Sequence, residues 1–159
     1  MSSLVTAPKD SQQTELFGRS FLLNQLVTAG FEVALPLRDR GVDLIVYQER
    51  DVSGQFIARP IQMKAASIKR FDIEKKFERT HDLLIVFVWH LNDSSKTCVY
   101  ALTYKELFEI AERRKYTDTD AWQKEKGKYN ITRPGVEIEG EFAAYKMVTP
   151  ADWIKKLKV

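Results

Sequence analysis

The stretches "GVDLIVYQ" (residues 41–48) and "FIARPIQMK" (residues 56–64) read as two β-strands, and the short turn-rich connection between them favours antiparallel neighbours. Alternation with a period of two places Asp43 on one face of the first strand. It places Gln62 and Lys64 together on one face of the second. If the two faces coincide, three polar side chains converge where a sheet normally buries apolar ones.

An amphipathic helix is predicted ahead of these strands. Asp10 or Ser11 is the expected N-cap, and Gly30 is the expected stop. At about 100° per residue, Glu15 falls at one end of a stripe whose other members are apolar: Leu22, Leu26 and Ala29. A carboxylate on an inward face must be hydrogen-bonded, paired or coordinated, because an isolated buried charge is costly.

Three further strands are expected. The first, "FEVALPLR" (31–38), precedes the two quoted above. "LLIVFVW" (83–89) is a continuous apolar run, which is typical of a strand covered on both faces and is expected to be central. "TCVYALT" (97–103) supplies the third, and Thr103 with Glu106 forms a capping box that opens an amphipathic helix.

The remaining segments complete the order of elements. Residues 68–82 read as a short, basic, partly helical connection, and residues 117–140 as a long polar excursion. A strand is predicted over 141–148, and Thr149 with Pro150 opens a C-terminal helix. This order predicts an α/β fold in which a central mixed β-sheet is flanked by helices.

With 159 residues and 44% hydrophobic content, the chain is expected to form a single domain over residues 10–159, after a flexible tail at residues 1–9. Neither a signal-peptide pattern nor a long apolar run is present, so we expect a cytoplasmic protein with no membrane partner. Cys98 has no second cysteine for a disulfide and is expected to be a buried small side chain. His81 and His90 lack further ligands at recognised spacing, and no GxSxG, P-loop or GxGxxG motif is present.

The polar residues suit divalent-metal phosphodiester chemistry. Magnesium, or manganese in its place, prefers oxygen ligands, and Mg²⁺ usually takes one or two carboxylates. Such an ion stabilises developing charge on phosphorus and lowers the pKa of a bound water, while a nearby ammonium orients or helps to deprotonate the nucleophile. The spacing of Gln62 and Lys64 directs both into one pocket.

The motifs "GVDLIV" and "PIQMK", with Glu15 on the preceding helix, resemble the PD-(D/E)XK nuclease superfamily in its QXK variant. The resemblance implies a restriction-endonuclease-like core and a magnesium-dependent (or manganese-dependent) endonuclease, with DNA as the expected substrate. It implies that Asp43 binds the metal, that Gln62 takes the acidic position of the (D/E)XK half and that Lys64 is its lysine. Glu15 would be the first-helix glutamate, and Met63 would offer its backbone carbonyl to the metal.

The resemblance covers about residues 11–90. Val42 replaces the proline of the family name, at a position that varies widely, whereas Gln62 replaces a carboxylate by a neutral amide that binds a hard cation less strongly. An alternative is therefore a catalytically inactive nuclease-derived domain that binds nucleic acid or a protein partner. A third reading, a plain interaction module, would place Asp43 and Lys64 in different environments.

The formal charge of +3 permits a nucleic-acid partner without indicating one. Basic residues that follow Lys64 are expected to emerge at the same end of the sheet as weak phosphate contacts: Lys69, Arg70, Lys75 and Lys76. Contacts of this kind position a duplex without reading its sequence, and they make binding fall with salt. A homodimer would suit the resemblance, because related enzymes often cut two strands with two subunits.

Overall fold

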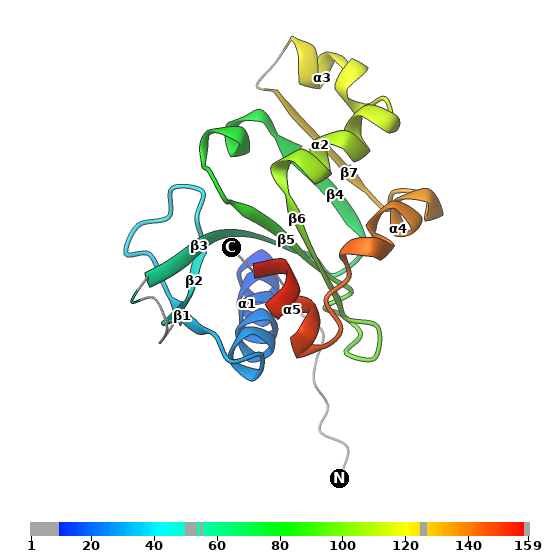
Figure 1. Cartoon of the computed structure of the whole chain (residues 1–159). Helices are drawn as coiled ribbons and strands as arrows, with labels where there is room; N and C mark the ends of the chain where they lie inside the picture. Colours follow the sequence, from blue (N-terminus) through cyan, green and yellow to red (C-terminus); the bar gives the residue numbers. More distant parts are fainter. Residues whose placement is uncertain (1–9, 50–53, 55, 125–126, 158–159) are drawn as a thin grey trace.

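The computed structural model of the chain describes residues 10–49, 54, 56–124 and 127–157 (Figure 1). The predicted flexible tail, residues 1–9, lies outside the described residues. Among the helices of the described part, none has the length and apolar character that crossing a membrane requires.

A five-stranded mixed sheet forms the centre of the fold, in the order β1-β2-β3-β5-β6. β1, β2 and β3 are antiparallel neighbours, β5 runs parallel to β3, and β6 runs antiparallel to β5. The predicted central mixed sheet flanked by helices is confirmed. The strand bounds are β1 (Glu32–Ala34), β2 (Leu44–Glu49), β3 (Phe56–Ala65), β5 (Leu84–Trp89) and β6 (Cys98–Thr103).

Strand β5 is covered on both faces, as its continuous apolar run predicts. All six of its residues are buried. Alternate side chains join one core cluster (Leu84, Val86, Val88) or a second cluster (Ile85, Phe87, Trp89). β5 is an interior strand, paired on both sides, but the middle strand of the five is its neighbour β3.

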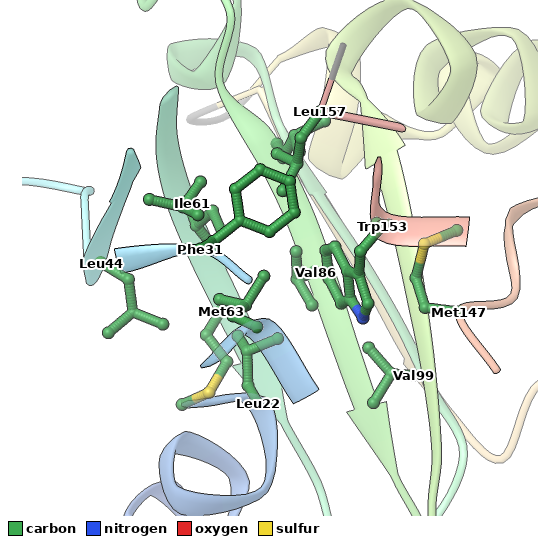
Figure 2. Close-up of a cluster of buried hydrophobic side chains, with 14 of the residues drawn as sticks. Leu22, Phe31, Leu44, Ile61, Met63, Val86, Val99, Met147, Trp153 and Leu157 are labelled. Atoms are coloured by element: carbon green, nitrogen blue, oxygen red, sulfur yellow. The ribbon is translucent and has the colours of Figure 1, made fainter. Parts of the chain in front are cut away.

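Two helices from opposite ends of the chain, α1 (Ser11–Thr28) and α5 (Pro150–Leu157), contribute to the first cluster and lie on one face of the sheet (Figure 1). Figure 2 shows this cluster, in which Leu22 of α1 and Trp153 of α5 lie around Val86 of β5. These contacts fix α1 against the main sheet.

Helix α1 begins and ends where the sequence predicts. The side chain of Asp10 accepts the backbone N–H of Gln13 at 2.8 Å, which caps the first turn. Gly30, just beyond the helix, has a φ of +87°, a conformation that favours glycine. Within the helix, Gly18 is buried and lies directly against Ala65 of β3.

The opposite face carries a two-stranded ribbon and three helices. The ribbon pairs β4 (Arg70–Glu74) with β7 (Lys128–Thr132), and the helices are α2 (Tyr104–Arg113), α3 (Asp120–Gln123) and α4 (Val136–Phe142). The predicted capping box of α2 is confirmed by reciprocal bonds between Thr103 and Glu106.

Three segments differ from the predictions. Residues 68–82 contain strand β4 followed by a 3₁₀ turn over Lys75–Arg79, so only the second half of the expected connection is helical. Residues 117–140 carry α3 and β7 as well as the start of α4. The strand predicted over 141–148 is wrong: α4 and a 3₁₀ turn occupy its first half, because Ile138 and Phe142 bury one helical face in the second cluster.

Candidate active site

A cavity of about 350 Å³ opens where β2 stops pairing with β3. It is lined by side chains from α1, the loop before β2, the end of β3 and the β4–β7 ribbon. Three of the predicted site residues, Asp43, Gln62 and Lys64, lie on it together with Glu15 and Met63. All five residues that the sequence nominates for catalysis or metal binding therefore meet at one cavity.

Asp43 directly precedes β2 and extends its pairing with β3 by one residue. Its backbone N–H donates to the carbonyl of Ile61 at 2.8 Å, which sets it opposite the end of β3. Its carboxylate oxygen Oδ2 accepts the backbone N–H of Met63 at 2.7 Å and the side-chain Nε2 of Gln62 at 2.6 Å. The side chain of Asp43 thus accepts the Met63 N–H in place of a backbone carbonyl.

The carbonyl of Met63 faces the same edge of β3. A strand residue directs its N–H and its C=O to one side, and the N–H of Met63 points to Asp43. Nε2 of Gln62 lies 3.4 Å from this carbonyl oxygen, at the same corner of the cavity. Asp43 and Met63 therefore present a carboxylate and a carbonyl side by side.

Asp43 shares the cavity lining with two further carboxylates, those of Asp39 and Glu15. Burial raises the pKa of Asp43, the charges of Asp39 and Glu15 raise it further, and the N–H of Met63 and the charge of Arg19 act in the opposite direction. The net effect is a pKa above the ordinary value of 3.8. Burial and like charges therefore disfavour the ionised form of Asp43, which a cation bound beside it would stabilise.

Glu15 is placed differently from the inward position that the helical stripe suggests. Its side chain is 56% exposed and pairs with Arg19 one turn later, at 2.7 Å. The first turns of α1 lie beside the cavity instead of over the core, so the carboxylate faces solvent and the cavity. Glu15 is therefore paired, as expected, but it is not buried.

The ammonium of Lys64 faces the β4–β7 ribbon. Its Nζ lies 3.4 Å from Oε1 of Glu74 and 3.6 Å from Oδ1 of Asp72, both on β4. The ring of Phe77 lies 5.1 Å from the same nitrogen. The Lys64 ammonium is therefore paired with carboxylates of the β4–β7 ribbon, whereas the Asp43 carboxylate is hydrogen-bonded to β3 of the main sheet.

Of the four basic residues predicted as phosphate contacts, only Arg70 lines the cavity. Lys69 pairs with Glu139 at 2.7 Å and Lys76 with Glu74 at 2.7 Å, while Nζ of Lys75 lies over the ring of Trp122.

Three charged residues that line the cavity are not among the predicted site residues: Asp39, Asp72 and Lys128. Asp72 lies on β4 and Lys128 on β7, the two strands of the ribbon. The sequence pattern predicts a connection, and not a strand, where β4 lies. The available signal was the alternation in "RFDIE", where Phe71 and Ile73 are fully buried. Asp39 lies in the loop before β2, and its carboxylate accepts the N–H of Gly41 at 2.9 Å.

The donor set can be compared with what a divalent cation needs. Within residues that the structure describes, no three Asp, Glu, His or Cys side chains form a ready metal cluster. Mg²⁺ usually takes only one or two carboxylates and completes its shell with waters and substrate oxygens, so Asp43 and the Met63 carbonyl fit this need. Gln62 would join them only with its amide turned so that Oε1 replaces Nε2.

The remaining candidates stay outside the site. His81 is exposed and His90 is half-buried, and neither lines the cavity. Cys98 is half-buried rather than fully buried, and burial raises the pKa of its thiol.

No family model matches the chain, and no curated protein matches it. Among solved structures, the bacterial homing endonuclease I-Ssp6803I aligns with 93% of this chain and 91% of its own, at 15% identity and a TM-score of 0.45. A likeness this distant carries no information about the substrate or the catalytic residues of this chain.

Proposed function

We propose that this protein is a metal-dependent nuclease that hydrolyses phosphodiester bonds, with DNA as its substrate. One observation carries the proposal: the Asp43 carboxylate and the Lys64 ammonium line the same cavity. The interaction-module reading would have set these two side chains in different environments. A cavity lined by a carboxylate and an ammonium suits a cation and a phosphate bound together.

Asp43 and the Met63 carbonyl would hold the metal, Mg²⁺ or Mn²⁺, with Glu15 reaching it directly or through a water. When bound, such an ion neutralises charge on the phosphate and lowers the pKa of a bound water. The negative charge shared by Asp39, Glu15 and Asp43 favours a cation beside Asp43. Gln62 would add a further oxygen donor with its amide reversed.

The basic side chains that the β4–β7 ribbon contributes to the cavity, called the basic wall here, would hold the substrate. Arg70 and Lys128 line the cavity with partly exposed side chains, and each is only loosely paired, at 3.5 Å from Asp72 and 3.4 Å from Glu74 respectively. Their positive charges would contact phosphate oxygens, which positions the strand without reading its bases. Lys64 would orient the attacking water from this side.

The contact between Gln62 and Asp43 favours a second candidate function. Nε2 of Gln62 donates to Asp43 at 2.6 Å, so the amide satisfies the carboxylate in the absence of a cation. A domain that keeps this pairing would bind nucleic acid through its basic wall and would not cut it. This is the inactive, nuclease-derived alternative.

A cleavage assay separates the two candidates. Supercoiled plasmid, linear duplex, single strand and a four-way junction would be incubated with Mg²⁺ or Mn²⁺ and the native chain, Asp43→Asn or Lys64→Ala. Lys105→Ala is the matched control, because Lys105 is exposed on α2 and does not line the cavity. Cleavage by the native chain and the control, lost in both site variants, supports the nuclease.

Equal cleavage by the native chain and both site variants would refute the proposed site. Absence of cleavage by every protein, with salt-sensitive binding to one of the substrates, would instead support the non-cutting alternative.

A further inference from the structure

We infer that Asp72, together with Glu74, is a positioning residue that fixes the Lys64 ammonium so that one N–H remains directed to the cavity. The inference rests on the proposed function, in which Lys64 acts on the attacking water or the phosphate. It assigns a role to the one buried charged side chain that the proposed chemistry does not otherwise use.

Asp72 is the only charged residue among the buried ones in the described part of the chain, with 3% of its surface exposed. Its neighbours on β4, Phe71 and Ile73, are fully buried in the second core cluster. Oδ1 of Asp72 is buried and accepts no hydrogen bond from the described residues. Burying a carboxylate with an unsatisfied oxygen is costly, so an apolar residue would serve a purely structural strand better.

The charges that face Asp72 are cationic. Nζ of Lys64 lies 3.6 Å from Oδ1, and a guanidinium nitrogen of Arg70 lies 3.5 Å from Oδ2. Neither distance is that of a short hydrogen bond, so both carboxylate oxygens retain capacity to accept. Asp72 therefore acts on Lys64 through charge, at the cavity that both residues line.

Glu74 plays a different part in the same cluster. Burial would raise its pKa, but the hydrogen bond from Lys76 and the charges of Lys64 and Lys128 hold the pKa below its usual value. Its carboxylate is thus already neutralised by three lysines. Asp72 has fewer cationic partners, so its charge is directed mainly to Lys64 and Arg70.

The ammonium geometry turns these contacts into orientation. A lysine ammonium has three N–H donors on a flexible stem. Carboxylate oxygens of Glu74 and Asp72 lie 3.4 and 3.6 Å from Nζ, and the centre of the Phe77 ring lies 5.1 Å from it. The donor that remains faces the cavity, where a water or phosphate oxygen can accept it. Holding a catalytic group in place before the substrate arrives lowers the barrier of the chemical step.

The first test measures Lys64 directly and does not depend on cleavage. Competitive acetylation of the full chain, read at each lysine by mass spectrometry, would compare the native protein with Asp72→Asn, Glu74→Gln and Glu78→Gln. Glu78 is the matched control, because it is an exposed acid close in sequence that makes no ion pair with any described residue. Lys105 provides the internal reference.

The acetylation rate of Lys64 should rise several-fold in Asp72→Asn, while the rate of Lys105 in the same protein stays unchanged. In Glu78→Gln, the rate of Lys64 should equal that in the native protein. Glu74→Gln should raise the rate too, and it keeps the test available if Asp72→Asn fails to fold. Unchanged reactivity of Lys64 in both folded variants would overturn the inference.

The second test uses cleavage kinetics. Asp72→Asn should lower kcat by about 10- to 100-fold with little change in KM, as the loss of an orienting partner does. Any residual cleavage by Lys64→Ala should fall no further when Asp72→Asn is added, because the effect of Asp72 acts through Lys64. An additive loss would overturn the positioning role. Absence of cleavage by the native chain would refute the proposed function, whereas the acetylation result would still decide how Asp72 acts on Lys64.

Discussion

The carboxylate of Asp43 accepts the backbone N–H of Met63 at 2.7 Å, at the point where β2 stops pairing with β3. The Asp43 side chain therefore satisfies a backbone N–H of β3 and would also be a ligand of the candidate metal site. The two roles can be separated experimentally, because the first needs an acceptor oxygen and the second needs a negative charge.

Replacing Asp43 by asparagine should abolish cleavage while keeping the fold. The amide oxygen can still accept the Met63 N–H, and the change removes a charge that burial, Asp39 and Glu15 disfavour. We expect the free energy of unfolding at neutral pH to stay equal or rise by up to about 1 kcal/mol. Urea denaturation and the plasmid assay measure the two effects. Asp43→Ala is the contrast: it leaves the buried N–H without an acceptor and should cost about 1–3 kcal/mol.

The pH dependence of this difference has a defined sign. The pKa of Asp43 is raised in the folded chain above 3.8, so the folded state binds the proton more tightly than the unfolded state does. Ionised Asp43 therefore lowers stability as pH rises above 3.8 and through the higher folded pKa. The stability advantage of Asp43→Asn should be greatest at neutral pH and disappear at about pH 4 or below.

Thermal melts of both proteins across this pH range test the prediction. Added Mg²⁺ should raise the Tm of the native chain at neutral pH, and the rise should fade on acidification because the ligand must lose its proton. A magnesium-induced rise of equal size in Asp43→Asn would exclude Asp43 as a ligand.

The sequence predicts the acidic half of the site better than the basic half. Period-two alternation within β2 and β3 brings Asp43 and Gln62 to one face, since local pairing decides their register. Lys64 is on the predicted face too, but its partners come from β4. That strand is short, and it pairs with β7 much later in the chain. Such a remote pairing leaves little trace in a single sequence.

The basic wall should dominate the salt dependence of DNA binding. Arg70→Gln and Lys128→Gln should each weaken binding and reduce the slope of log affinity against log salt by about one, because each removes one phosphate contact. Binding would be measured by fluorescence anisotropy with Ca²⁺ to prevent turnover. Lys124→Gln is the control: Lys124 pairs with Asp120 on the surface and does not line the cavity. Equal slopes for all three variants would place the DNA elsewhere.

The close packing of α1 against β3 at Gly18 is expected to affect both stability and the candidate site. A methyl group at Gly18 would come 2.5 Å from Cβ of Ala65, which lines the cavity, and 3.3 Å from Cδ1 of Leu91. Alanine is the better helix former by about 1 kcal/mol, yet overpacking of this kind costs about 1–3 kcal/mol. Gly18→Ala should therefore lower the free energy of unfolding. It should also slow cleavage, because a displaced α1 carries Glu15 away from Asp43.

Gly140→Ala is the matched control for this substitution. Gly140 lies within α4, and an added methyl group there has no atom within 4 Å, so only the gain in helix propensity remains. Urea denaturation should show an increase of about 0.5–1 kcal/mol, with cleavage unchanged. If Gly18→Ala instead matched Gly140→Ala in both measurements, α1 would have room to adjust on β3, and the position of Glu15 would not depend on that close contact.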